Sequence, residues 1–157
     1  MRINNAEGLQ IKGKWRLTAR NVKTGEVIIK EGDNLIVTVG KELLGRMLID
    51  EAGYDTGLTY CAIGSNAAAP NIADTVLGTE SARKAITSKT RVSNVITLST
   101  FFTAAQSTFA LEEAGIFGHS TATAAADSGV LFSHWLSAFD NSLAAFDITW
   151  DYVLQLG

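Results

Sequence analysis

The sequence has very little cysteine, proline or histidine and no long hydrophobic run. Its 157 residues include one cysteine, one proline and two histidines. A single cysteine excludes an intrachain disulfide and any zinc site built from several cysteines. No apolar run approaches the roughly 20 residues that a membrane-spanning helix needs, and the first residues lack the apolar stretch of a secretory signal. We therefore expect neither a disulfide-stapled protein nor a membrane protein.

Positive charge is also scarce, and it is unevenly placed. Charged residues make up 18% of the sequence, below the roughly 25% of an average soluble domain. Lys and Arg number nine in residues 1–50, only four in residues 51–157 and none after Arg91, and the net charge is −3. Because no basic run is dense enough to follow phosphates, we expect no nucleic-acid partner. We expect the stretch 92–157, which has no Lys or Arg, to supply most of the β core and much of the contact between subunits.

Alternation of apolar and polar residues predicts strands along most of the chain. Residues 14–20 alternate, residues 21–26 have turn chemistry and residues 27–30 return, which predicts a hairpin followed by a second turn at 31–34. Residues 146–156 alternate for eleven positions and would lay six large side chains on one face. Further strands are expected at 35–37, 58–64, 108–117 and 130–136, with two more in 82–102 around a break at 88–94. About eight strands predict a mainly β fold, a β-sandwich or a β-tulip or barrel-like domain.

One short α-helix is expected at about 39–49. Apolar residues recur there at spacings of four and form one stripe, and Thr38 is a suitable N-cap. Asp74 is expected to cap a single helical turn that ends at Leu77. The whole chain is expected to form a single β-rich domain, with an N-terminal arm at 1–11 and the β domain at 12–157.

The alternation also points large aromatic side chains inward. We expect the core to contain Trp15, Trp135, Phe146, Trp150 and Tyr152. The three tryptophans would have to be exposed to bind a host glycan, and their places in strand patterns favour packing in the core instead.

The sequence carries no motif for catalysis or metal binding. His119 and His134 show no metal-ligand spacing, so we expect a surface histidine and a core or interface histidine, respectively. Cys61 lies in the middle of a predicted strand and is expected to be a buried, inert thiol. Glu112 and Glu113 are adjacent, so on a strand they face opposite sides and cannot act together on one bond. No phosphate-binding glycine motif occurs. We expect no enzyme, no catalytic residue, no metal and no cofactor.

One group of charged residues is expected to hold the structure together. Arg83 follows Glu80 by three residues, so a bidentate ion pair between them is feasible, and Glu113 is a second candidate partner for Arg83. With Asp74, these residues would anchor a long loop against the sheet; the alternative is an exposed pair that contributes little.

Several short motifs occur in an order that resembles small structural proteins of tailed-bacteriophage virions. After an N-terminal hairpin and before an Ala/Thr/Ser-rich loop and an alternating last strand, the chain contains 34–40 (NLIVTVG), 62–64 (AIG), Pro70, 74–83 (DTVLGTESAR) and 113–117 (EAGIF). The resemblance covers about residues 12–156. The loop after Gly64 departs from it, because Ser65-Asn66-Ala67-Ala68 stands where the pattern has a Gly/Thr-rich run.

This resemblance implies a non-enzymatic virion protein. The leading expectation is a capsid decoration, or cement, protein on the outer surface of the head, assembled as a homotrimer and bound to the major capsid protein. The alternatives are a tail, baseplate or fibre-associated structural protein, and a module that binds host glycans. We expect the contact with an acidic capsid surface to involve four basic residues on one strand face, Lys12, Lys14, Arg16 and Arg20.

Overall fold

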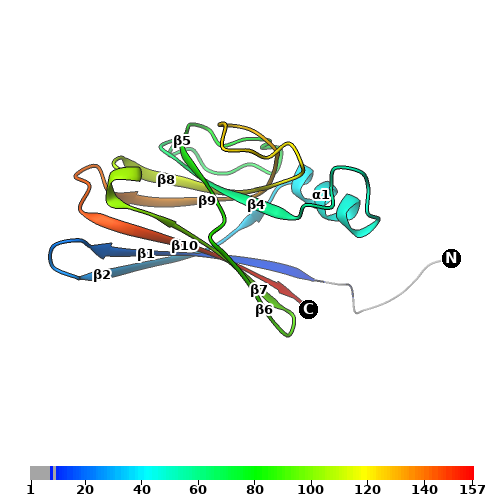
Figure 1. The fold of residues 1–157 in the computed structure, drawn as a ribbon, viewed down its shortest axis with the longest axis horizontal. Helices are drawn as coiled ribbons and strands as arrows, with labels where there is room; N and C mark the ends of the chain where they lie inside the picture. The colour runs from blue at the N-terminus through cyan, green and yellow to red at the C-terminus, as the bar shows by residue number, and fades with distance from the viewer. Residues whose placement is uncertain (1–7, 9) are drawn as a thin grey trace.

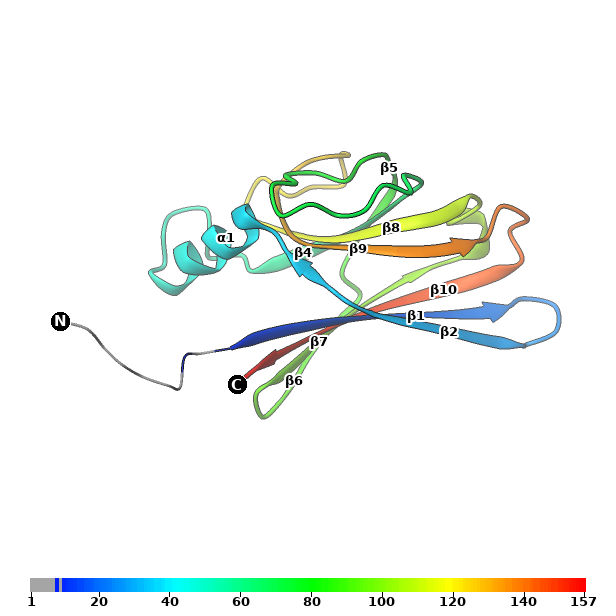
Figure 2. The same cartoon turned by 180° about the vertical axis from the view of Figure 1, so that it is seen from behind.

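The computed structural model, which describes residues 8 and 10–157, consists of two five-stranded antiparallel sheets packed face to face (Figures 1 and 2). Sheet A has the strand order β2-β1-β10-β7-β6, and sheet B has the order β3-β9-β8-β4-β5. The strands are β1 (Ile11–Asn21), β2 (Val27–Asp33), β3 (Leu35–Ile36), β4 (Leu58–Gly64), β5 (Glu80–Ala85), β6 (Ser88–Val92), β7 (Val95–Phe102), β8 (Ala110–Gly118), β9 (Val130–Asp140) and β10 (Phe146–Leu156). The predicted mainly β, sandwich-like fold is confirmed.

The structure has ten strands rather than about eight, and the segment 82–102, where two strands were expected, contains parts of three. The residues predicted as a break form β6, which pairs with β7 in a tight hairpin at the edge of sheet A. All five residues of β6 are exposed, so its sequence has no apolar alternation that would predict a strand. The turn predicted at 31–34 is also wrong, because β2 continues through Asp33.

The α-helix α1 runs from Thr38 to Leu48, close to the predicted range. Its N-cap is Val37, without a side-chain cap, so the prediction of Thr38 as N-cap is wrong. The helical turn predicted from Asp74 does not form either. The Asp74 carboxylate accepts a hydrogen bond from the Asn71 backbone N–H at 2.7 Å and closes a local turn instead. A 3-10 helix, η1 (Ala104–Gln106), connects β7 to β8.

Aromatic side chains fill the space between the two sheets. Trp15 of β1 stacks on Trp135 of β9 with ring centroids 6.1 Å apart, and Trp150 of β10 meets both rings edge-on. These tryptophans and Tyr152 are buried. Phe146 is only partly buried, at the end of the sandwich where the chain enters β10. The alternating faces of β1 and β10 therefore meet in the core, as period-2 strands require.

The outer face of sheet B is covered as well, by the loops 65–79 and 119–129, and α1 lies at one end of the sandwich (Figure 2). A second apolar cluster lies under this cover: Val37, Ala62, Leu77, Phe117 and Leu131. The inner strands β8 and β9 are consequently buried on both faces for most of their length. Strands in that environment have almost no place for a lysine or arginine.

The predicted arm at 1–11 lies almost entirely outside the described residues. Ile11 itself begins β1, one residue before the predicted start of the β domain. At the other terminus, Gly157 exchanges two backbone hydrogen bonds with Gln10, at 2.6 and 2.9 Å. The two ends of the folded domain therefore lie side by side.

Candidate functional site

A buried carboxylate, Glu113 of β8, organises the outer face of sheet B. Its side chain is 1% exposed. It accepts hydrogen bonds from the backbone N–H groups of Thr79 at 2.7 Å, Gly78 at 2.9 Å and Asn66 at 3.3 Å. These donors lie at the two ends of the 65–79 loop. A single buried side chain therefore satisfies backbone groups that the loop would otherwise leave unpaired.

His134 of β9 connects Glu113 to Asp74. The imidazole is 4% exposed, with Nε2 at 2.9 Å from Glu113 Oε2 and Nδ1 at 2.8 Å from Asp74 Oδ2. Ionised carboxylates only accept hydrogen bonds, so both ring nitrogens can donate to them only in the protonated imidazolium form. In that form the imidazolium links the sheet to the loop through two charge-assisted hydrogen bonds. We call Glu113, His134 and Asp74, with the three backbone donors, the Glu113 cluster.

A β-bulge puts His134 on this face. The pairing of β9 with β8 shifts by one residue at Phe132, and Phe132 and Ser133 both face the core. Ser133 accepts a hydrogen bond from the indole N–H of Trp15 at 3.1 Å. The next residue, His134, then turns outward, because a bulge adds one residue to the alternation.

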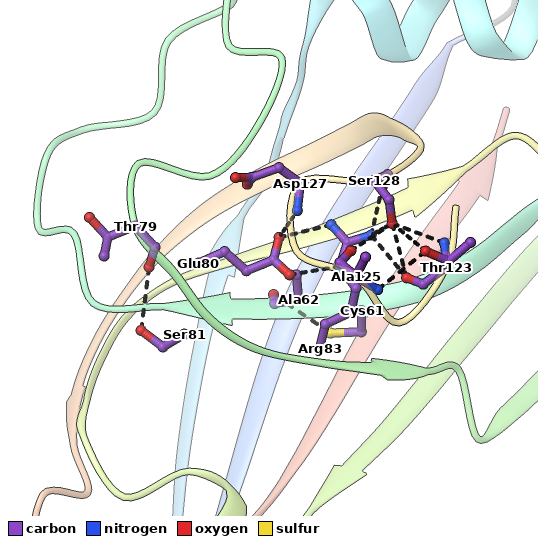
Figure 3. A network of polar contacts seen from close by, with 10 residues as sticks. All are labelled: Cys61, Ala62, Thr79, Glu80, Ser81, Arg83, Thr123, Ala125, Asp127 and Ser128. Carbon is purple, nitrogen blue, oxygen red and sulfur yellow. Dashed lines mark hydrogen bonds and ion pairs between the residues drawn. The ribbon is translucent and has the colours of Figure 1, made fainter. Parts of the chain in front are cut away.

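A second buried group, the Arg83 cluster, lies farther along sheet B (Figure 3). Arg83 and Glu80 of β5 form a bidentate ion pair, with N–O distances of 2.7 and 2.8 Å and side chains that are both 2% exposed. The guanidinium also donates to the Ser128 carbonyl oxygen at 2.6 Å and lies 4.1 Å from the centroid of the Phe117 ring. Glu80 accepts from the Asp127 backbone N–H at 3.1 Å. This cluster pins the 119–129 loop as the Glu113 cluster pins the 65–79 loop.

The structure divides the four predicted anchor residues between the two clusters. Arg83 pairs with Glu80, and the alternative partner Glu113 binds His134 instead, so a pair between Arg83 and Glu113 is not formed. His134 was expected in the core or at an interface, and its link to Asp74 and Glu113 was missed. The only signal for that link was chemical: a buried carboxylate needs donors, and the chain has just two histidines.

The four predicted contact residues, Lys12, Lys14, Arg16 and Arg20, are exposed on the outer face of sheet A. Lys14 and Arg16 both lie near the Glu31 carboxylate, at 3.4 and 3.9 Å. In the strand register, three of the four basic residues lie directly opposite carboxylates. Lys14 is opposite Asp33, Arg16 is opposite both Glu31 and Asp151, and Arg20 is opposite Asp147. This face therefore carries charges of both signs rather than a uniform positive patch.

The remaining candidates do not form a reaction centre with these clusters. Cys61 of β4 is fully buried, and burial raises the pKa of its thiol to about 12. His119 is half-buried, and its ring packs against Tyr54 with centroids 4.4 Å apart. Among residues 8 and 10–157, no group of three or more His, Cys, Asp or Glu side chains is placed to hold a metal ion. Within the same residues, no helix is long and apolar enough to cross a membrane.

Comparisons with models of known protein families, with curated proteins and with solved structures found no match to this chain.

Proposed function

We propose that this chain is a non-enzymatic structural protein of a tailed-bacteriophage virion. Within that class we propose a capsid decoration protein, which binds the outer surface of the head as a homotrimer and stabilises contacts between copies of the major capsid protein. The observation that carries the proposal is the order of the motifs along the sequence, taken with the work that the motif residues do in the fold.

That work is the fixing of loops. The motif at 74–83 supplies Asp74, Glu80 and Arg83, and the motif at 113–117 supplies Glu113, so the buried clusters are built mostly from motif residues. The glycine of the AIG motif has a structural role too. A Cβ on Gly64 would overlap the Thr79 carbonyl oxygen and the Glu113 carboxylate. A signature used to fix surface loops on a rigid sheet suits a protein that acts by shape and attachment.

The mechanism would be mass action. A protein that binds an assembled shell, and not its separated parts, stabilises the shell by the free energy of that binding. The outer face of sheet A is a suitable attachment surface, because no helix or loop of the described residues covers it (Figure 1). Because this face carries charges of both signs, we expect a partner surface that also carries both, rather than a capsid surface that is only acidic.

The test is reconstitution on particles. Heads of the encoding phage, prepared from a strain that lacks this gene, are mixed with purified protein and imaged by electron cryomicroscopy. We expect density on the outer surface of the head and a higher temperature of head disruption. Replacing Lys12, Lys14, Arg16 and Arg20 with serine should weaken binding, whereas the control change Lys23→Ser and Lys41→Ser, at two exposed lysines away from this strand face, should not. Density confined to the tail would favour a tail, baseplate or fibre-associated protein, and absence from the particle would overturn the proposal.

Binding of a host glycan would require an exposed tryptophan ring. Trp15, Trp135 and Trp150 are at most 7% exposed, so none of them offers a ring face to a sugar.

A further inference from the structure

An apolar groove lies between α1 and the β6–β7 hairpin, two elements at the same end of the sandwich (Figure 1). It has a volume of about 370 Å³. Its walls come from α1, β4, β7 and β10 and include Leu44, Met47, Leu58, Ile96, Leu98 and Leu154. Leu44, Met47, Leu58 and Ile96 are partly exposed there, and the buried Leu98 and Leu154 lie beneath them.

Two cations stand at the rim of this groove. Lys89 and Arg91 of β6 pair with Leu98 and Ile96 of β7, so they lie on the core-facing side of the sheet and border the groove. Neither cation forms an ion pair within the described part of the chain; Arg91 donates to a backbone carbonyl, that of Ser93, at 2.7 Å. An apolar cavity with a positive rim selects an apolar group that has a carboxylate beside it.

A group of that kind projects from the opposite end of the molecule, in the loop between β9 and β10 (Figures 1 and 2). Leu143 is 88% exposed, the highest value among the exposed large hydrophobic side chains of the described residues. Asp140 lies three positions before it, is exposed, and accepts a hydrogen bond from the Ser142 backbone N–H at 2.9 Å.

The loop between β9 and β10 is fixed by hydrogen bonds, although the side chain of Leu143 is largely exposed. The Asn141 amide is buried, donates to the carbonyl oxygens of Ser107 and Phe146 at 3.1 and 2.9 Å, and accepts the Phe146 N–H at 3.0 Å. A leucine presented on such a fixed loop loses little further conformational freedom when a partner covers it.

We propose that Leu143 of one copy of this chain inserts into the groove of a second copy, with Asp140 facing Lys89 and Arg91. The inference deepens the proposed function, on which it rests for the expectation of self-association. The contact joins two different surfaces, so each added copy leaves one groove and one loop free. Such an interface continues until it closes as a ring or extends as a filament.

The test measures mass in solution. Sedimentation of the full-length protein at micromolar to millimolar concentrations should show concentration-dependent species larger than the monomer. Leu143→Ser should weaken association by about tenfold or more, because a buried leucine returns to water. The matched control Ile72→Ser, which changes an aliphatic side chain that is 48% exposed elsewhere on the surface, should associate like the wild type.

A charge exchange separates a specific contact from a misfolded variant. Replacing Lys89 and Arg91 with glutamate should abolish association, and adding Asp140→Lys to that protein should restore it. A wild-type protein that stays monomeric throughout, or a Leu143→Ser variant that associates like the wild type, would overturn the interface. Binding to heads is measured separately: a monomer that binds heads refutes this interface and the homotrimer but not the attachment to the head, and an oligomer that does not bind heads refutes only the proposed function.

Discussion

At the scale of single residues, Glu113 explains how a charge is tolerated inside this protein. An ionised carboxylate is costly to bury unless its oxygens are paired, and here three backbone N–H groups and the His134 ring surround it. The neighbouring Glu112 is partly exposed. The two adjacent glutamates therefore have opposite roles, although nothing in their own chemistry distinguishes them.

Replacing each glutamate with alanine tests this difference. Glu113→Ala should lower the free energy of unfolding by about 3–5 kcal/mol, because it leaves the buried His134 ring and several backbone N–H groups without their acceptor. Glu112→Ala should change it by less than about 0.5 kcal/mol, as a surface substitution does. Urea unfolding followed by tryptophan fluorescence measures both. Similar losses in the two variants would contradict the role assigned to Glu113.

Cys61 gives a prediction about alkaline pH. Burial raises the pKa of its thiol from 9.0 to about 12, and burial likewise raises the pKa of the Tyr152 hydroxyl. The folded state therefore keeps protons that the unfolded chain releases first. The stability that these groups contribute is fully present below about pH 9 and is lost as the pH rises toward 12. Unfolding measured across this range should show a falling free energy, with a shallower fall in Cys61→Ala. An unchanged slope in that variant would show that the thiol is not the source.

At the scale of elements, the sequence predicts a strand wherever one face of the strand is buried and the other is exposed to water. β1 and β10 alternate because one face meets the core and the other meets water. β6 escaped prediction because both of its faces are exposed, and β9 showed apolar residues on both faces because both are covered. The helix was predicted from its stripe, whereas its cap depends on where the chain leaves β3.

The candidate site was harder to predict for a related reason. The pairing of Arg83 with Glu80 follows from local spacing, so the sequence indicates it. The contact of His134 with Glu113 depends on a bulge at Phe132 that changes which residues face outward. No periodicity encodes a single inserted residue, so a contact that depends on one is visible only in the fold.

The element that Arg83 holds is the 119–129 loop. Arg83→Lys keeps the charge but loses the bidentate geometry and the donors to Ser128, and should lower the free energy of unfolding by about 2–3 kcal/mol. Hydrogen exchange should rise in this loop before it rises in the sheets. The control is Arg46→Lys, at an ion pair with Glu51 whose side chains are 45% and 40% exposed, where we expect less than about 1 kcal/mol. Equal effects at the two positions would contradict the anchoring role.

At the scale of the whole molecule, the topology accounts for part of the uneven charge of the sequence. The stretch without Lys or Arg forms β7, β8, β9 and β10, which are four of the six inner strands of the two sheets. The strands that carry the Lys and Arg residues, such as β1, β2, β5 and β6, have an outer face in water or lie at an edge. Burial on both faces explains the missing cations of β8 and β9, whereas β7 and β10 keep an outer face in water, so burial does not account for theirs. Contact between subunits then needs its own argument, which the groove and the Leu143 loop supply.

Because Gln10 and Gly157 are adjacent, the fold and the interface can be tested together by circular permutation. Gly157 is joined to Met1, so that residues 1–9 form the linker, and new ends are opened either between Ala125 and Ala126 or between Ser142 and Leu143. Both cuts lie in exposed loop segments and leave every strand pairing intact, so both permutants should fold with native tryptophan fluorescence. Only the first keeps the fixed loop that presents Leu143. It should associate like the wild type, whereas the second should sediment as a monomer. Association of the second permutant at wild-type strength would mean that the loop does not form the contact. Failure of both permutants to fold would mean that the sandwich does not tolerate the joining of Gly157 to Met1.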